Sequence, residues 1–99
     1  MAPSHSNRPI HQLLDLLSRR WTLRVLWELR DGPVTFRQLQ DKADQVSPTV
    51  LNTRLAELRR HHIVDRGEHG YQLTERGAEL ASQLIDLHRW AERWIGDSR

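Results

Sequence analysis

The sequence contains no cysteine. Disulfide bonds, thiolate metal ligands, cysteine nucleophiles and thiol-based redox sensing are therefore excluded. The sequence also has no apolar run near the roughly 18 residues that a membrane-spanning helix needs, and it does not open with a signal-peptide pattern. We therefore expect a soluble, cytoplasmic protein with no membrane partner.

The motifs of common enzyme classes are missing as well. Six histidines and 13 acidic residues could supply acid–base groups, but there is no nucleophile elbow, phosphate-binding loop or HExxH pair. His61 and His62 point to different sides of a predicted helix end and lack the third and fourth ligands of a metal site. The sequence therefore assigns no catalytic residue, metal or cofactor, and we do not expect an enzyme.

Charge is unevenly placed along the 99 residues, whose net charge is only +2. Residues 1–33 carry five basic and three acidic side chains, residues 34–66 carry six and four, and residues 67–99 carry four and six. The positive excess therefore lies in the first two thirds of one small domain, as nucleic-acid binding requires.

The most informative stretch is 47–62, SPTVLNTRLAELRRHH. Ser47 is a suitable N-cap and Pro48 suits the first helical position. Leucines at i, i+4 and i+7 predict one buried stripe: Leu51, Leu55 and Leu58. The opposite face is small and polar near its start and basic near its end. It carries Thr49, Thr53, Ala56 and Arg60, flanked by Asn52 and Glu57. Small hydrogen-bonding side chains can approach base edges closely, which is typical of a recognition helix.

An amphipathic helix alone fits any globular domain, so its neighbours matter. Residues 1–9 read as a flexible arm. Leucines then predict helices over 10–20 and 21–30, with Ser18 as a cap of the second. After the Asp31-Gly32-Pro33 stop, Thr35 caps a helix over 36–43, and a short connection leads to Ser47. Two short helices joined by a tight turn predict a helix-turn-helix.

A hairpin and a long helix follow. Residues 63–66 and 71–73 read as strands around a turn at 67–70, and residues 34–35 could form the edge of that small sheet. Thr74 then caps a helix over 75–95, which Gly77 slightly weakens. The order predicts a mainly α fold with a small β-hairpin, a winged helix-turn-helix spanning 10–95.

The last helix carries more apolar surface than one face of a small domain can use. Four tryptophans in so short a chain also indicate an interface. We therefore expect a homodimer in which 10–18 and 75–95 pack against a second copy. The predicted interface residues are Leu13, Leu17, Leu84, Leu87, Trp90 and Trp94.

Three segments together resemble the HxlR-type bacterial transcription regulators: RRWTLRVLWELRDGPVTFRQLQ, SPTVLNTRLAELRRHHIVDR and YQLTERGAEL. The similarity runs from about Leu17 to Trp94 and includes the spacing between the segments. It implies a homodimer that binds a pseudopalindromic operator in double-stranded DNA. The second helix of the helix-turn-helix would lie in the major groove and the wing near the minor groove.

On this chain the resemblance implies a set of DNA-binding residues. Base-reading candidates are Pro48, Thr49, Asn52 and Thr53, and Arg37 and Gln38 fall where such proteins hold the backbone. The remaining candidates are Ser47, Arg60, Arg66 and His69. Arg54 lies toward the edge of the buried stripe, so it either braces the helix or reaches a phosphate.

The chain departs from the family in two ways. Its wing, GEHG, is shorter than usual and bears Glu68 at its tip rather than a basic pair. Several relatives sense electrophiles or oxidants through a cysteine near the first helix, which this chain lacks. Any regulation must therefore come from a small ligand, a partner or the expression level, and the sequence identifies no effector.

One alternative is a winged-helix module that binds proteins instead of DNA. Such modules tend to carry acidic or large apolar residues on the outer face of the second helix. Here that face stays small and polar, with Val50 and Glu57 as the exceptions. This difference favours a DNA-binding transcription regulator.

Overall fold

The computed structural model describes residues 8–97 and shows five helices and one antiparallel hairpin in that range. The predicted mainly α fold with a small hairpin is confirmed, in the predicted element order. The elements are α1 (Pro9–Leu17), α2 (Thr22–Glu28), α3 (Phe36–Lys42), α4 (Pro48–Arg60), β1 (Val64–Gly67), β2 (Gly70–Leu73) and α5 (Glu75–Asp97).

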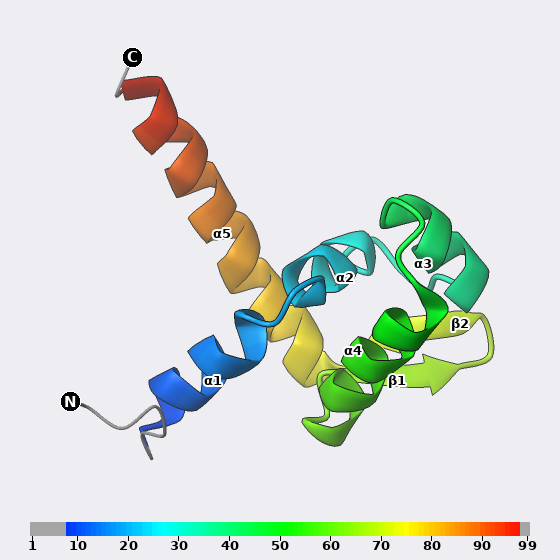
Figure 1. Cartoon of the computed structure of the whole chain (residues 1–99). Coiled ribbons are helices and arrows are strands. Elements are labelled where there is room, and N and C mark those ends of the chain that lie inside the picture. Colours follow the sequence, from blue (N-terminus) through cyan, green and yellow to red (C-terminus); the bar gives the residue numbers. More distant parts are fainter. Residues whose placement is uncertain (1–7, 98–99) are drawn as a thin grey trace.

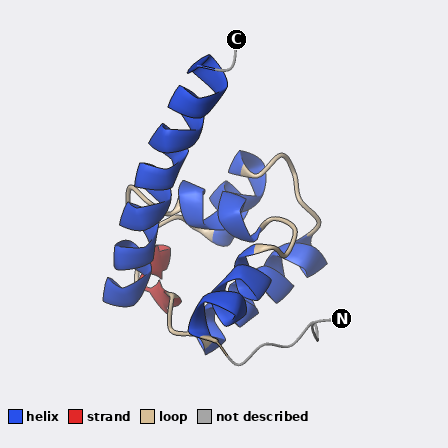
Figure 2. Cartoon of the chain, turned by 90° about the vertical axis from the view of Figure 1, so that its left-hand side faces the viewer, coloured by secondary structure: helices blue, strands red, loops and turns tan. Residues whose placement is uncertain are grey.

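The elements divide between two sides of the molecule. Figure 1 shows α3, α4 and the hairpin on one side, whereas α1 and the C-terminal half of α5 project from the other. Seen from that second side, α5 runs as one continuous helix away from the two short strands (Figure 2). The side with α3, α4 and the hairpin is therefore separate from the side with α1 and the C-terminal half of α5.

The core lies between α2, α3 and α4. The predicted leucine stripe of α4 is confirmed, because Leu51, Leu55 and Leu58 are each at most 1% exposed. Leu26 of α2 and Leu39 of α3 are equally buried against them. Burial of a leucine side chain stabilises a fold by roughly 1.5–3 kcal/mol. This stripe therefore fixes which face of α4 looks outward.

The hairpin turn is tighter than the sequence indicates. Strand β1 pairs with β2 up to Gly67 and Gly70, so the turn has two central residues rather than four. The predicted edge of the sheet at residues 34–35 is confirmed as a single β-bridge between Val34 and Tyr71. The N–H group of each residue donates to the carbonyl oxygen of the other at 2.9 Å. Gly70 has φ +123°, and a Cβ there would lie 2.5 Å from the Val34 oxygen. The bridge therefore requires glycine at this position.

Thr74 caps α5 as predicted, since its Oγ1 accepts the Gly77 N–H at 3.0 Å. Gly77, which we expect to weaken the helix slightly, also has a packing role. A Cβ at Gly77 would lie 2.0 Å from the Ile63 carbonyl oxygen. The missing side chain is what lets the start of α5 approach the backbone that precedes β1.

The first two helices differ in detail from the prediction. Ser18 does not cap α2, because its Oγ donates to the Asp15 carbonyl at 2.9 Å and α2 begins after Trp21, whose φ is 80°. Leu16 is the buried residue of α1, whereas Leu14 is 54% exposed. Helix α1 already begins at Pro9, and residues 1–7 of the predicted arm lie outside the described residues.

Candidate nucleic-acid interface

The turn between α3 and α4 is held by side chains at both of its ends. Asp44 and Gln45 have φ values of 56° and 59°, which is the left-handed region that non-glycine residues rarely occupy. The Gln40 amide donates to the Val46 carbonyl at 3.0 Å, and the Gln45 amide donates to Asp41 at 2.9 Å. These bonds fix the angle between the two helices.

Arg24 of α2 ties this turn to the core, a role that the sequence did not reveal. Its Nε donates to Glu28 at 2.9 Å and its Nη1 to Asp44 at 3.2 Å, while Nη2 donates to the Lys42 carbonyl. The hydrogen bond to Glu28 is the main cause that raises the pKa of Arg24 above its usual value. One guanidinium therefore binds a group on α2, a group on α3 and a group in the turn between α3 and α4.

The α4 outer face consists of Ser47, Pro48, Thr49, Asn52 and Thr53, and all five residues are exposed. Ser47 Oγ accepts the Val50 N–H at 3.3 Å, which confirms the predicted cap. The Thr53 hydroxyl donates to the Thr49 carbonyl at 2.9 Å, so its orientation is fixed. The structure thus brings these predicted residues together on one solvent-facing patch, outside the protomer core.

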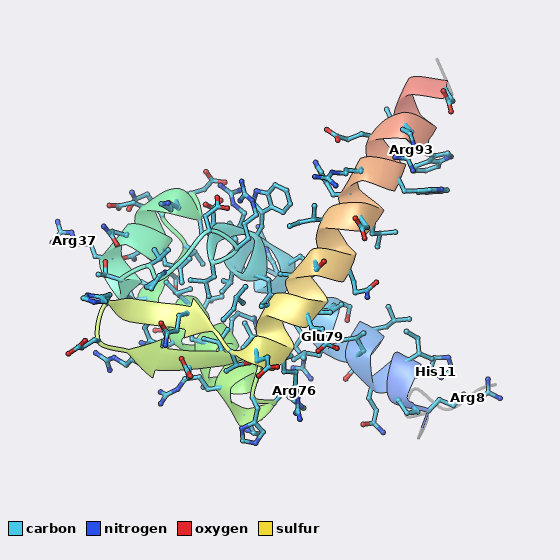
Figure 3. All side chains as sticks on the ribbon, turned by 180° about the vertical axis from the view of Figure 1, so that it is seen from behind. Arg8, His11, Arg37, Arg76, Glu79 and Arg93 are labelled. Carbon is cyan, nitrogen blue, oxygen red and sulfur yellow. The ribbon has the colours of Figure 1, made fainter. Side chains whose placement is uncertain are left out.

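Arg37 and Gln38 lie at the start of α3, in the helix that precedes this patch. Thr35 and Gln38 form a capping box, in which the Gln38 Oε1 accepts the Thr35 N–H at 3.0 Å and Thr35 Oγ1 accepts the Gln38 N–H at 3.1 Å. The oxygen of the Gln38 amide is therefore used locally, and its NH₂ group is left to donate. Arg37 points away from the body of the molecule (Figure 3).

Arg54 makes the bracing contacts rather than facing solvent. Its Nε donates to the Arg20 carbonyl at 2.9 Å and its Nη1 to Glu57 at 2.7 Å, and its side chain is 18% exposed. Glu57 also lies 3.5 Å from Arg19. These contacts join α4 to the connection between α1 and α2. The geometry therefore matches the alternative in which Arg54 braces the helix.

The other basic candidates lie apart from the α4 outer face. Arg60 follows Thr49 by 11 positions, which corresponds to about 16 Å along a helix. The Arg66 guanidinium lies 5.6 Å from the ring centroid of Tyr71 on the hairpin. His69 is exposed in the turn beside Glu68, and its Nε2 lies 4.0 Å from Glu68 Oε2. Glu68 offsets positive charge at the tip of this short wing.

Neither a metal cluster nor a membrane span is evident within residues 8–97. No three histidine, aspartate or glutamate side chains of that range gather closely enough to hold a metal ion. None of the helices in that range is both long enough and apolar enough to cross a bilayer.

The predicted dimer residues divide between the protomer core and the surface. Leu87, Trp90 and Trp94 are 59%, 53% and 55% exposed, and the two indole rings stack with centroids 5.8 Å apart. In contrast, Leu17 and Leu84 pack against the protomer's own core. Leu13 is half-buried. Four large apolar side chains outside the predicted set are also about half exposed: Ile10, Leu14, Leu23 and Ile95.

A family model described as HxlR-like helix-turn-helix matches residues 16–99. The chain is 32% identical over 92 residues to YvaP, an uncharacterized HTH-type transcriptional regulator of Bacillus subtilis, with 86% of this chain and 85% of YvaP covered. The similarity therefore extends along most of both chains.

Solved structures show the same fold. Quinone-bound YodB from B. subtilis superimposes with a TM-score of 0.78 at 31% identity, covering 85% of this chain and 96% of YodB. A possible HxlR family transcriptional factor from Thermoplasma volcanium gives 0.74 at 25% identity, covering 100% and 88%. The relatives are transcriptional regulators, which are not enzymes. This winged helix chain therefore belongs to the HxlR-like helix-turn-helix family of transcription regulators.

Proposed function

We propose that the protein is a sequence-specific DNA-binding regulator that binds a pseudopalindromic operator as a homodimer. The observation that carries this proposal is the α4 outer face, which is exposed while the leucines behind it are buried. A helix of this kind fits the major groove of B-DNA, which is about 12 Å wide. A regulator must reach the chromosome, so the proposal also places the protein in the cytoplasm.

The α4 outer face offers the chemistry that reads base edges. The Asn52 amide can accept from N6 and donate to N7 of an adenine. Because the Thr53 hydroxyl donates to the Thr49 carbonyl, its oxygen faces the groove as an acceptor for an exocyclic amino group. The methyl groups of the two threonines and the Pro48 ring suit the methyl group of thymine.

Phosphate contacts would set the register of this helix. Arg37 is exposed on α3 and the Gln38 NH₂ group is available beside it. Arg60, Arg66 and His69 are further candidates at the end of α4 and on the wing. Such contacts position the protein on the duplex but carry no base information.

The second copy is proposed to cover the α1 and α5 side. That side lies away from α3 and α4 in Figure 1, so a two-fold dimer through it leaves both α4 outer faces free. Trp90 and Trp94 each present about half of the 150–250 Å² that an aromatic side chain can bury. Two recognition helices one DNA turn apart would be separated by roughly 34 Å.

Selection of bound duplexes from a random pool, at two salt concentrations, tests this function. We expect a two-fold symmetric sequence whose half-sites are centred about 10 base pairs apart, and an affinity that falls steeply with salt. A folded dimer that enriches no sequence at either concentration would favour the protein-binding module instead.

Arg37→Ala is expected to weaken binding to all duplexes by a similar factor and to reduce the slope of log affinity against log salt by about 0.9. The reason is that one phosphate contact is lost while base readout stays intact. Filter binding over a salt series measures both effects. Arg89→Ala, which removes an exposed arginine of α5, is the matched control. An unchanged slope in Arg37→Ala would remove this residue from the interface.

A further inference from the structure

An apolar pocket of about 390 Å³ lies between α2 and α5. Leu23 and Leu26 of α2 and Leu84 and Ile85 of α5 form its walls, with Trp27 beside them. Leu87, a predicted dimer residue, also lines it, so the pocket borders the surface that the second copy is proposed to cover. The volume falls in the usual range for small-molecule sites, which are mostly apolar with a few polar groups. The pocket is separate from the α4 outer face, because no residue of α3 or α4 is among those of residues 8–97 that line it.

The titratable side chains that line this pocket are all basic residues, and two of them have an acidic neighbour: Arg24 Nε lies 2.9 Å from Glu28, and His88 Nε2 lies 3.5 Å from Glu92. Arg24, Arg30 and His88 line it, and no carboxylate is among the lining side chains of the described range. The Arg30 guanidinium lies 3.9 Å from the Trp27 ring centroid, and the His88 ring lies 4.9 Å from it. Both groups therefore lie beside the same indole.

We propose that this pocket binds a small aromatic carboxylate, with its ring among the leucines and its carboxylate toward Arg30 and His88. Aromatic rings pack well against the indole and imidazole rings already present. A single carboxylate suits a mainly apolar site better than a dianion, since each added charge raises the cost of desolvation. Arg30 Nη1 donates to the Trp27 carbonyl at 2.8 Å and its guanidinium stacks on the Trp27 ring. A ligand would keep both contacts and replace only the contact of Nη2 with Asp31, which is 3.7 Å away and exposed.

Arg24 connects this pocket to the helix-turn-helix. It lines the pocket, and its guanidinium holds Asp44 and the Lys42 carbonyl at the turn before α4. A ligand that shifts Arg24 therefore changes how α4 is held. This step rests on the proposed function, because its consequence is a changed operator affinity. A coupling between two sites usually alters affinity by about 5- to 150-fold.

Isothermal titration calorimetry of the full chain with cinnamate, without DNA, tests the binding step. We expect one cinnamate per chain, bound at least tenfold more tightly than its neutral amide, cinnamamide. Ala91→Leu fills the pocket from α5 and should weaken cinnamate binding at least tenfold, whereas Ala78→Leu, an exposed position on the same helix, should change it less than twofold.

The charge preference is tested separately with Arg30→Gln/His88→Gln. This variant keeps the apolar walls and should bind cinnamate and cinnamamide equally well. Circular dichroism confirms that each variant is folded. No cinnamate binding by the unaltered chain, unchanged binding in Ala91→Leu, or a retained preference for the acid in the double variant would each overturn the proposed site.

Operator binding with and without saturating cinnamate tests the coupling. We expect at least a fivefold change in the unaltered chain and less than a twofold change in Asp44→Asn, which loses the charge held by Arg24 but keeps the pocket. An unchanged operator affinity overturns the coupling alone. Failure to bind DNA at all overturns the proposed function, and the calorimetric result stands independently of both.

Discussion

Trp90→Glu/Trp94→Glu is expected to be monomeric and to bind the operator at least about 100-fold more weakly, since the avidity of two linked half-sites is worth 10²–10⁴. The two rings stack on each other and about half of each is exposed. Charge at these positions would have to be desolvated when the two copies meet. Sedimentation velocity measures the oligomeric state, and fluorescence anisotropy with labelled operator measures the affinity.

The choice of these two tryptophans follows from the fold. Leu84 packs against the protomer's own core, so a charge there would unfold the chain as well as separate the copies. Ser82→Glu/Arg89→Glu adds more negative charge on a different face of α5 and should remain dimeric. If the tryptophan variant still sediments as a dimer, the interface lies elsewhere.

Gly77→Ala is expected to lower the free energy of unfolding by about 3 kcal/mol, near the upper end for overpacked sites. Its Cβ would lie 2.0 Å from the Ile63 carbonyl oxygen, which is a backbone atom that cannot rotate away. The start of α5 would have to move, and the Thr74 N–H bond to the same carbonyl at 3.0 Å would be strained. Urea denaturation followed by circular dichroism measures the change.

Gly96→Ala is the matched control for that experiment. It lies in the same helix, and a Cβ there meets nothing within 4 Å. Because alanine favours helix more than glycine by up to about 1 kcal/mol, the stability should stay the same or rise slightly. Equal stability of the two variants would contradict the close approach at Gly77.

Local patterns were sufficient to predict much of this fold. The caps at Thr35, Ser47 and Thr74 and the leucine stripe of α4 depend on residues within one or two turns of each other. Such short-range signals can be recognised from sequence. The position of the α4 outer face follows from them, because a helix that buries one face must expose the other.

The features that the sequence did not reveal depend on contacts between distant segments. The need for glycine at position 77 arises from Ile63, and the bracing of Arg54 depends on the Arg20 carbonyl 34 positions away. Periodicity marks Leu84 and Leu87 as apolar alike, but only the fold shows that Leu84 packs against the core while Leu87 is exposed. The role of Arg24 was hidden for the same reason, since two of its three partners, the Lys42 carbonyl and Asp44, come from α3 and from the turn after it.

We expect the α4 outer face to read base edges. Asn52→Ala tests it most directly, through affinities for the selected operator and for a random duplex at the same salt concentration. We expect operator affinity to fall by about 1–3 kcal/mol, or roughly 5- to 150-fold, while random-duplex affinity is unchanged. Equal losses on both duplexes, or no loss on either, would contradict the claim.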